Sequence, residues 1–374
     1  FVLKNASGTS VPATVSYDSS ANVATLTPTA ALQYGSAYRA VLVAGGVKDL
    51  AGNPLAAEVS WSFTTESSPP PLLVVTSSSN PFGMYLTEIL RNEGLDAFST
   101  LDTSLLSASV LSNFDVVLLS DASLTSGQVT TLTNWVNGGG KLIAMSPDKK
   151  LAGLLGLTSA AGTTSNAYLK VDTSSGPGVG ITDQTIQYHG SADRYLLSGA
   201  TAVATIYSNA TTPTVNPAVT LASVGAAGGQ AAAFTYDLAR SVVYTRQGNP
   251  AWAGQNRDGT VPIRPDDLFF GAAAFDPQPD WVDLTKVHIP QADEQQRLLA
   301  NLILWMNSSR KPLPRFWYFP SGRKAVVILT GDDHSNGGTA GRFDLYKSLS
   351  PVGCSVVNWE CIRSTSYIYT TNLF

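Results

Sequence analysis

The strongest constraint on the fold is an alternation of strand and helix patterns between residues 72 and 145. Leu72–Val75, Phe114–Leu119 and Lys141–Met145 are short apolar runs, typical of strands that are buried on both faces. An amphipathic helix pattern separates the first two runs, and a second pattern, opened by a capping box of Thr125 and Gln128, separates the last two. This order predicts a parallel sheet with right-handed crossovers.

Two proline-containing stretches divide the chain. Glu66–Pro71 and Asn307–Pro314 have the composition of stiff linkers. We therefore predict a multidomain chain with an all-β sandwich at residues 1–66, an α/β domain at 72–306 and a third domain at 313–374. Further strands are expected in the α/β domain, followed by a closing helix at Gln291–Met306. These strands are Ala202–Tyr207, Ala231–Tyr236 and Ser241–Thr245.

The N-terminal region has short alternating runs that are divided by Gly, Pro, Asn and Asp, which indicates a β-sandwich. The predicted strands are Ala13–Tyr17, Val23–Leu26, Ala37–Val43 and Val59–Thr64. Leu26-Thr-Pro28, Val47–Pro54 and Trp61–Thr65 resemble the bacterial Ig-like domain of S-layer and surface proteins. The resemblance implies a spacer or adhesion module without catalysis.

The middle region, from Leu72 to about Trp305, resembles the class I glutamine-amidotransferase-like superfamily and its ThuA-like relatives. The resemblance implies a parallel-sheet, flavodoxin-like α/β domain. The true amidotransferases use a cysteine nucleophile at a strand-to-helix elbow, and this region has no cysteine. Ser146 follows Lys141–Met145 and could be nominated as nucleophile, but no G-x-S-x-G motif surrounds it, and a turn serine before Pro147 is the better explanation. We predict that the domain is not catalytic.

Polar and aromatic residues gather after residue 245, a composition that suits sugar binding because aromatic rings stack on pyranose faces. We nominate Arg246, Trp252 and Arg264 as substrate-binding residues. The alternative is that these side chains anchor loops and form surface ion pairs. The whole cluster is Arg246, Trp252, Asp258, Arg264, Asp266 and Asp267.

The chemistry is concentrated in Lys324–Gly338. Ala325–Leu329 is predicted to be a buried strand, and Asp332, Asp333 and His334 follow it directly. Catalytic groups collect at the carboxyl ends of such strands. A carboxylate and an imidazole can hold a divalent metal while a second carboxylate deprotonates water. The alternative is that the aspartates cap the next helix or bind loop amides.

This stretch resembles the first motif of the polysaccharide deacetylases, the NodB-like carbohydrate esterases, which reads Thr-Phe-Asp-Asp-Gly. Thr330, Asp332 and Asp333 match it, while Gly331 replaces the Phe and His334 replaces the Gly. The resemblance implies a (β/α) barrel of which this chain holds the first part, with Asp332 as general base and Asp333 as metal ligand. His334 as a second ligand of zinc or a similar divalent metal is our own assignment.

The family's second motif, a His-x-x-x-His pair, has no match, because the histidines are His189, His288 and His334. Two hypotheses follow: a metal-dependent carbohydrate deacetylase that is incomplete in this chain, or a non-catalytic cell-surface structural or carbohydrate-binding protein. Cys354 and Cys361 are either a disulfide in an oxidising compartment or two thiols.

Composition limits the partners. Charged residues make up 13% of the chain and the net charge is −4, so a nucleic-acid partner is not expected. No apolar run approaches the roughly 20 residues of a membrane span. Abundant Ser, Thr, Ala and Gly are common in extracellular bacterial proteins. We expect a secreted or cell-surface protein whose partner is a polysaccharide or another glycan.

Overall fold

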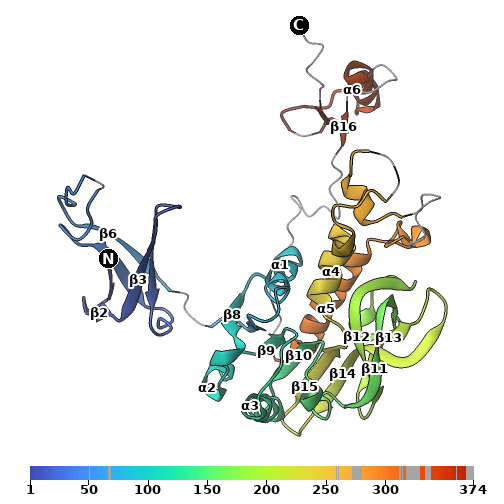
Figure 1. Cartoon of the computed structure of the whole chain (residues 1–374), viewed down its shortest axis with the longest axis horizontal. Helices are drawn as coiled ribbons and strands as arrows, with labels where there is room; N and C mark the ends of the chain where they lie inside the picture. The colour runs from blue at the N-terminus through green and yellow to red at the C-terminus, as the bar shows by residue number, and fades with distance from the viewer. Residues whose placement is uncertain are drawn as a thin grey trace. The chain divides into compact units, whose positions relative to one another are not determined.

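The structure is a computed structural model. It describes residues 1–49, 51–65, 69–257, 259, 261–271, 280–310, 313, 315–316, 329–332, 338–358 and 360–367, without the side chains of Asp332 and Tyr367. The chain divides into two compact units, Phe1–Phe316 and Trp317–Phe374. The first unit contains an N-terminal set of small sheets and a separate nine-stranded sheet (Figure 1).

The N-terminal module consists of antiparallel strands, as predicted. One sheet has the order β2-β1-β5-β6, and β3 and β4 form a separate hairpin. The pairs Tyr38↔Phe63 and Ala40↔Trp61 place both aromatic rings of β6 on one face of the sheet. The core on this face is small and contains Leu3, Tyr38 and Ala40. The strands are β1 Val2–Asn5, β2 Ser10–Val11, β3 Ala13–Asp18, β4 Val23–Pro28, β5 Ala37–Leu42 and β6 Val59–Thr64.

A nine-stranded sheet with the order β12-β11-β13-β14-β15-β10-β9-β7-β8 forms the middle of the chain. β8, β7, β9, β10 and β15 are parallel to one another. If these five strands are numbered 1 to 5 along the chain, their order across the sheet is 2-1-3-4-5, which is the flavodoxin-like order. They are β7 Leu72–Thr76, β8 Phe98–Asp102, β9 Val116–Leu119, β10 Lys141–Met145 and β15 Gly229–Phe234.

The other half of this sheet is antiparallel, so the prediction of a parallel sheet was right for one half only. β11 to β14 lie between β10 and β15 in the chain, where only the strand Ala202–Tyr207 was predicted, and that strand is observed as β13. Their Ser-, Thr- and Gly-rich sequences and their bulges obscure the strand pattern. These strands are β11 Leu157–Val171, β12 Ile186–Leu197, β13 Thr201–Tyr207 and β14 Pro213–Val224.

Helices cover both faces of the large sheet (Figure 1). The core on one face includes side chains of α1, α4 and α5, and the core on the other face includes side chains of α2 and α3. The predicted capping box of Thr125 and Gln128 is present at the start of α3. The helices are α1 Tyr85–Asn92, α2 Ala108–Leu111, α3 Ser126–Asn137, α4 Leu238–Gln247 and α5 Gln291–Asn307.

The predicted strand Ser241–Thr245 was wrong, because these residues lie in α4. The valines and the threonine of Ser241–Thr245 have a high intrinsic preference for strands. Asp237 instead caps a helix, accepting a hydrogen bond from the Arg240 backbone N–H at 3.1 Å. Leu238 and Val242, one turn apart, are both buried against the sheet, and this packing stabilises the helix.

The C-terminal unit contains one strand–helix–strand motif among its described residues. β16 (Thr330–Asp332) pairs in parallel with β17 (Thr365–Tyr367), and α6 (Gly338–Leu349) lies between them in the chain. Most of the predicted strand Ala325–Leu329 lies outside the described residues, and strand geometry is observed from Thr330 onward.

Candidate functional site

The candidate catalytic residue Asp332 is the last residue of β16, paired with Tyr367 of β17. The prediction placed Asp332 just beyond a strand, and the structure places its backbone inside one. Asp333 and His334, the nominated metal ligands, lie outside the described residues. Because β16 and β17 are parallel, their carboxyl ends meet at one edge, where substrates bind in α/β folds.

Beside this edge, three side chains form a hydrogen-bonded group that the sequence did not indicate. The Ser366 hydroxyl donates to the Gly331 carbonyl at 3.2 Å and lies 2.7 Å from the Thr339 hydroxyl. The Arg342 Nη2 donates to the same Ser366 oxygen at 2.5 Å. A Cβ on Gly331 would lie 2.8 Å from the Arg342 guanidinium carbon, so glycine leaves room for this arginine. The available signal in the sequence was Gly331 itself, which stands where the deacetylase motif that this stretch resembles has a Phe.

A metal site can be assessed from the donors that the chain offers. Within the residues that the structure describes, no group of three His, Cys, Asp or Glu side chains could hold a metal ion. Asp333 and His334 are donors of the type that zinc takes, but they are one fewer than the three protein ligands of catalytic zinc sites.

Two of the nominated sugar-binding residues lie in one loop cluster. The Arg257 guanidinium lies 3.5 Å above the Trp252 ring, and Trp281 meets Trp252 edge-on at 6.1 Å. The buried carboxylate of Asp267 accepts from the backbone N–H groups of Arg257 and Arg264, both at 2.8 Å. Trp252 and Arg264 therefore contribute to the anchoring of these loops.

Arg246 is held elsewhere, at the end of α4. Its guanidinium forms an ion pair with Asp293 of α5 at 2.5 Å, and both side chains are about half exposed. This pair joins two helices on the same face of the sheet. Asp258, the remaining acidic member of the cluster beyond Asp266 and Asp267, lies outside the described residues.

A further polar group lies at the carboxyl edge of the parallel strands, where the strand order reverses between β7 and β9. Asp237 is buried and accepts from the Asn80 side-chain amide at 3.1 Å. Burial raises the pKa of Asp121 to about 6, the negative charges of Asp237 and Asp193 add to this shift, and Arg240 opposes it. Reversal points of this kind hold ligands in many α/β proteins.

Ser146 lies immediately after β10 with φ of +39°, an uncommon conformation for a serine. Its backbone N–H donates to the Phe234 carbonyl at 2.8 Å. The two described imidazoles have other neighbours: His189 stacks on Trp281 at 4.1 Å, and the His288 Nε2 lies 3.2 Å from the Gln184 amide. These contacts supply no general base to Ser146.

The two cysteines form a disulfide. Cys354 and Cys361 are bonded through their sulfurs, with their Cα atoms 5.3 Å apart. This resolves the two alternatives in favour of a cross-link, which closes the short loop after α6. Disulfides persist in oxidising compartments.

Residues 1–65 match the family model of the bacterial Ig-like domain. This match confirms the Ig-like module, and such domains are typical of extracytoplasmic proteins. A comparison with the curated proteins finds no match.

Solved structures share a weak likeness with this chain. An exo-beta-1,4-mannosidase from Opitutaceae bacterium strain TAV5 is 16% identical with a TM-score of 0.36, covering 48% of this chain and 33% of the mannosidase. An alpha-L-fucosidase from Paenibacillus thiaminolyticus is 14% identical (TM-score 0.37; 47% and 30%). A cytoplasmic protein from Salmonella typhimurium is 14% identical (TM-score 0.34; 54% and 85%). The chain spans about a third of the mannosidase. At such TM-scores these likenesses carry no argument about activity.

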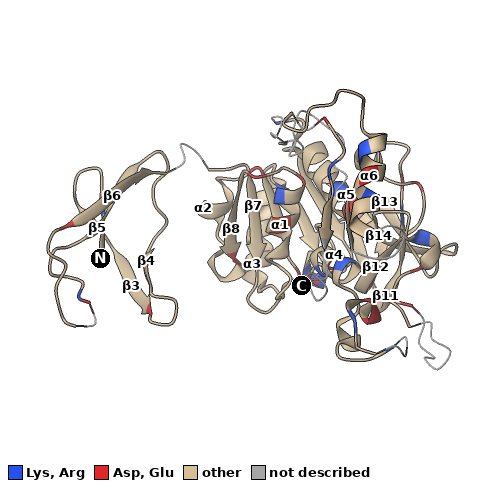
Figure 2. Ribbon diagram, turned by 90° about the horizontal axis from the view of Figure 1, so that it is seen from above, with Lys and Arg blue, Asp and Glu red and all other residues tan. Residues whose placement is uncertain are grey.

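The described helices were also compared with the requirements of a membrane span. None of them combines the length and the apolar character needed to cross a bilayer. Charged side chains of both signs are sparse over the ribbon (Figure 2).

Proposed function

We propose that this chain belongs to an extracytoplasmic bacterial protein that acts on a glycan through a deacetylase-like hydrolase site begun by Asp332. The observation that carries the proposal is the position of Asp332 at the carboxyl end of β16, in a parallel strand–helix–strand motif. The Thr330-x-Asp332-Asp333 sequence supplies the two carboxylates that such a reaction needs. The Ig-like module and the Cys354–Cys361 disulfide support an oxidising, extracytoplasmic location.

In this proposal each residue has one role. Asp332 takes the proton from the water that attacks the acyl carbonyl carbon, and it passes the proton to the leaving sugar oxygen or nitrogen. Asp333 and His334 would hold a divalent metal such as zinc, which when bound polarises the carbonyl and acidifies water. Ser366 and Arg342 hold the end of β16 in place through the Gly331 carbonyl.

The alternative is a non-catalytic cell-surface protein in which the modules space or bind glycans. The Ig-like module favours this reading as strongly as the first, because spacing needs no active site. The two hypotheses differ in one property, which is hydrolysis by a chain that contains every metal ligand.

The test combines calorimetric titration with zinc, cobalt and nickel and an acetate-release assay on acetylated oligosaccharides. We expect weak metal binding and no acetate release from residues 1–374, since two ligands do not make a firm site. A longer chain that includes a His-x-x-x-His pair should gain both properties. In that longer chain, Asp332→Asn should lower the rate of acetate release at least about 100-fold and leave metal affinity unchanged.

Asp344→Asn is the matched control, because Asp344 is an exposed carboxylate of α6. It should alter neither measurement. Tight metal binding by residues 1–374 would show that the ligands are misplaced. An active Asp332→Asn variant of the longer chain would show that the general base is another residue. An inactive longer chain that still binds glycans would favour the non-catalytic alternative.

A further inference from the structure

A pocket of about 410 Å³ opens between the last turns of α5 and strands β13, β14 and β15. Its volume lies within the range of small-molecule sites, roughly 300–1,000 Å³. None of its described lining residues belongs to the C-terminal unit or to the loop cluster around Trp252. Its lining includes Asp172, Pro177, Thr201, Gln230 and Trp305.

Trp305 is the aromatic wall of this pocket. Its side chain is 51% exposed, although its helix neighbours Ile303 and Met306 are buried in the core. An indole face carries partial negative charge, and the C–H groups on one face of a pyranose ring are weakly positive and apolar. A sugar ring is therefore a suitable partner for an exposed tryptophan that lines a pocket.

The polar side chains around the ring match sugar hydroxyls. Asp172 Oδ1 accepts from the Ser174 hydroxyl at 2.6 Å and from the Ser174 backbone N–H at 3.0 Å. These two hydrogen bonds lower the pKa of Asp172, so the carboxylate is ionised at neutral pH. Both bonds use Oδ1, and Oδ2 can accept from a ligand hydroxyl. The Gln230 amide and the Thr201 hydroxyl add donors and acceptors.

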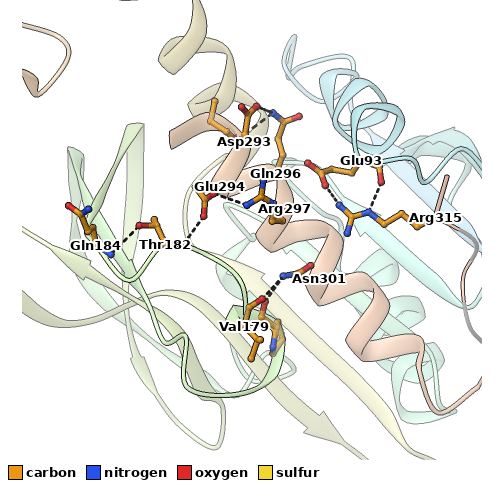
Figure 3. Close-up of polar contacts among 12 residues, drawn as sticks. Glu93, Val179, Thr182, Gln184, Asp293, Glu294, Gln296, Arg297, Asn301 and Arg315 are labelled. Atoms are coloured by element: carbon orange, nitrogen blue, oxygen red, sulfur yellow. Dashed lines mark hydrogen bonds and ion pairs between the residues drawn. The ribbon is translucent and has the colours of Figure 1, made fainter. Parts of the chain in front are cut away.

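The turn after β11, which forms the pocket wall that carries Asp172 and Pro177, is fixed in position. Asn301 lies one helical turn before Trp305, and its side-chain amide donates to the carbonyls of Pro177 at 3.0 Å and Val179 at 3.2 Å (Figure 3). A Cβ on Gly178 would lie 1.9 Å from the Asp172 carbonyl oxygen, so only glycine allows this approach. The turn that carries Asp172 is therefore held against α5 before any ligand arrives.

A second set of contacts holds the segment between β11 and β12 against α5. The buried Glu294 of α5 accepts from the Thr182 backbone N–H at 2.6 Å and pairs with Arg297 at 2.8 Å (Figure 3). The segment between β11 and β12 is thus fastened to α5 at both Asn301 and Glu294. Because these pocket walls are already ordered in the free protein, less conformational entropy is lost when a ligand binds.

We propose that this pocket is a glycan subsite that takes one neutral pyranose unit, stacked on Trp305 and hydrogen-bonded by Asp172 and Gln230. Among the described residues, the lining contains one carboxylate and no Lys, Arg or His, so uronic acids are repelled and neutral sugars are preferred. The inference does not depend on the hydrolase proposal, because the pocket lies entirely within residues 172–305.

The experiment uses the complete 374-residue chain and saturation-transfer NMR, which detects weak binding on the protons of the sugar. The probes are the neutral hexasaccharides of β-1,4-glucose, β-1,4-mannose, β-1,4-xylose and N-acetylglucosamine, together with oligogalacturonate. We expect at least one neutral oligosaccharide to bind and oligogalacturonate not to bind. Trp305→Ala should weaken binding about tenfold or more, and Trp305→Phe should weaken it less. Asp172→Asn should weaken binding of the neutral oligosaccharide and lessen the discrimination against oligogalacturonate.

Trp61→Phe is the matched control, because Trp61 is 48% exposed and lies in the Ig-like module. Circular dichroism and melting curves verify that each variant is folded, and Gln230→Ala is a second probe of the pocket. Binding unchanged in Trp305→Ala, or absence of binding to every neutral probe, would overturn the proposal. So would a loss of binding in Trp252→Ala with Trp305→Ala unaffected, which would move the site to the loop cluster. Sugar binding without acetate release by the longer chain would leave this subsite intact and refute only the hydrolase.

Discussion

The two halves of the large sheet differ in how they exclude water. In the parallel half, every side chain of β9 is at most 1% exposed, because α1, α4 and α5 cover one face and α2 and α3 cover the other. In the antiparallel half, β14 combines a 79% exposed Val215 with a fully buried Val219. The inner strands of the parallel half therefore form a closed core, whereas the antiparallel half has partly open surfaces and contributes to the Trp305 pocket.

The antiparallel half also adjoins a buried polar network. The Gln295 side chain of α5 accepts from the hydroxyls of Tyr236 at 3.2 Å and Ser241 at 2.8 Å, and it donates to the Gln187 carbonyl at 3.1 Å. The Ser241 hydroxyl in turn accepts from the His189 backbone N–H at 3.1 Å. Such networks specify one arrangement of helix and strand, provided that every member has a partner.

The largest expected effect is in the closed core. Leu118→Ala in β9 removes a fully buried side chain and leaves a cavity between packed layers. We expect a loss of about 3–4 kcal/mol in the free energy of unfolding. Val215→Ala in β14 is the control and should stay within about 0.5 kcal/mol of the unmodified chain. Urea denaturation followed by tryptophan fluorescence measures both, and equal losses would contradict the proposed difference between the halves.

The same difference decides what could be predicted from sequence. β7, β9 and β10 were predictable because strands buried on both faces are continuous apolar runs, and α3 was predictable from its capping box. β11 was not, because its half-exposed, Ser- and Thr-rich sequence has bulges that break the alternation. α4 was mistaken for a strand because burial of its apolar face, which local propensity does not reveal, stabilises it.

The candidate sites show the same limit. The Asp332 motif was found because its residues are adjacent in the chain. The contact of Arg342 with Ser366 depends on the parallel pairing of β16 with β17, which are far apart in sequence. Trp305 was predicted only as part of the closing helix Gln291–Met306, and its pocket exists because the segment between β11 and β12 returns to α5.

The next effect concerns His189 of β12. The imidazole is 3% exposed, and its Nδ1 has no hydrogen-bond partner among the described residues. Burial lowers the pKa of His189 from 6.5 to about 4. Between these values the unfolded chain binds more protons, so the free energy of unfolding falls as the pH falls from 6.5 to 4. The loss should total about 3 kcal/mol.

His189→Phe keeps an aromatic ring against Trp281 and removes the titration. We expect this variant to lose less stability than the unmodified chain between pH 6.5 and pH 4. His288→Phe, at an exposed position, is the control and should keep the full pH dependence. Urea midpoints measured at half-unit pH intervals test this, and parallel curves for His189→Phe and the unmodified chain would refute it.

The smallest effect, and one of opposite sign, is expected at Asp121 beyond β9. Burial and the charges of Asp237 and Asp193 raise the pKa of this carboxyl from 3.8 to about 6. The folded chain therefore binds more protons in this window, and the free energy of unfolding falls as the pH rises from 3.8 to 6. Because the side chain is only partly buried, solvent screening reduces the effect to about 1 kcal/mol at neutral pH.

Asp121→Asn should therefore stabilise the chain at pH 7 and have no effect below about pH 3.8, where the native carboxyl is already protonated. Asp96→Asn, at an exposed position, is the control and should change the stability at neither pH. The comparison with His189 is sharp because acidification through the same window weakens the fold through the imidazole and strengthens it through the carboxyl. If Asp121→Asn were destabilising at pH 7, the attraction between the Asp121 carboxylate and the positive charge of Arg240 would outweigh burial and the two like charges. The ionised Asp121 carboxylate at the carboxyl edge of the parallel strands would then stabilise the folded chain.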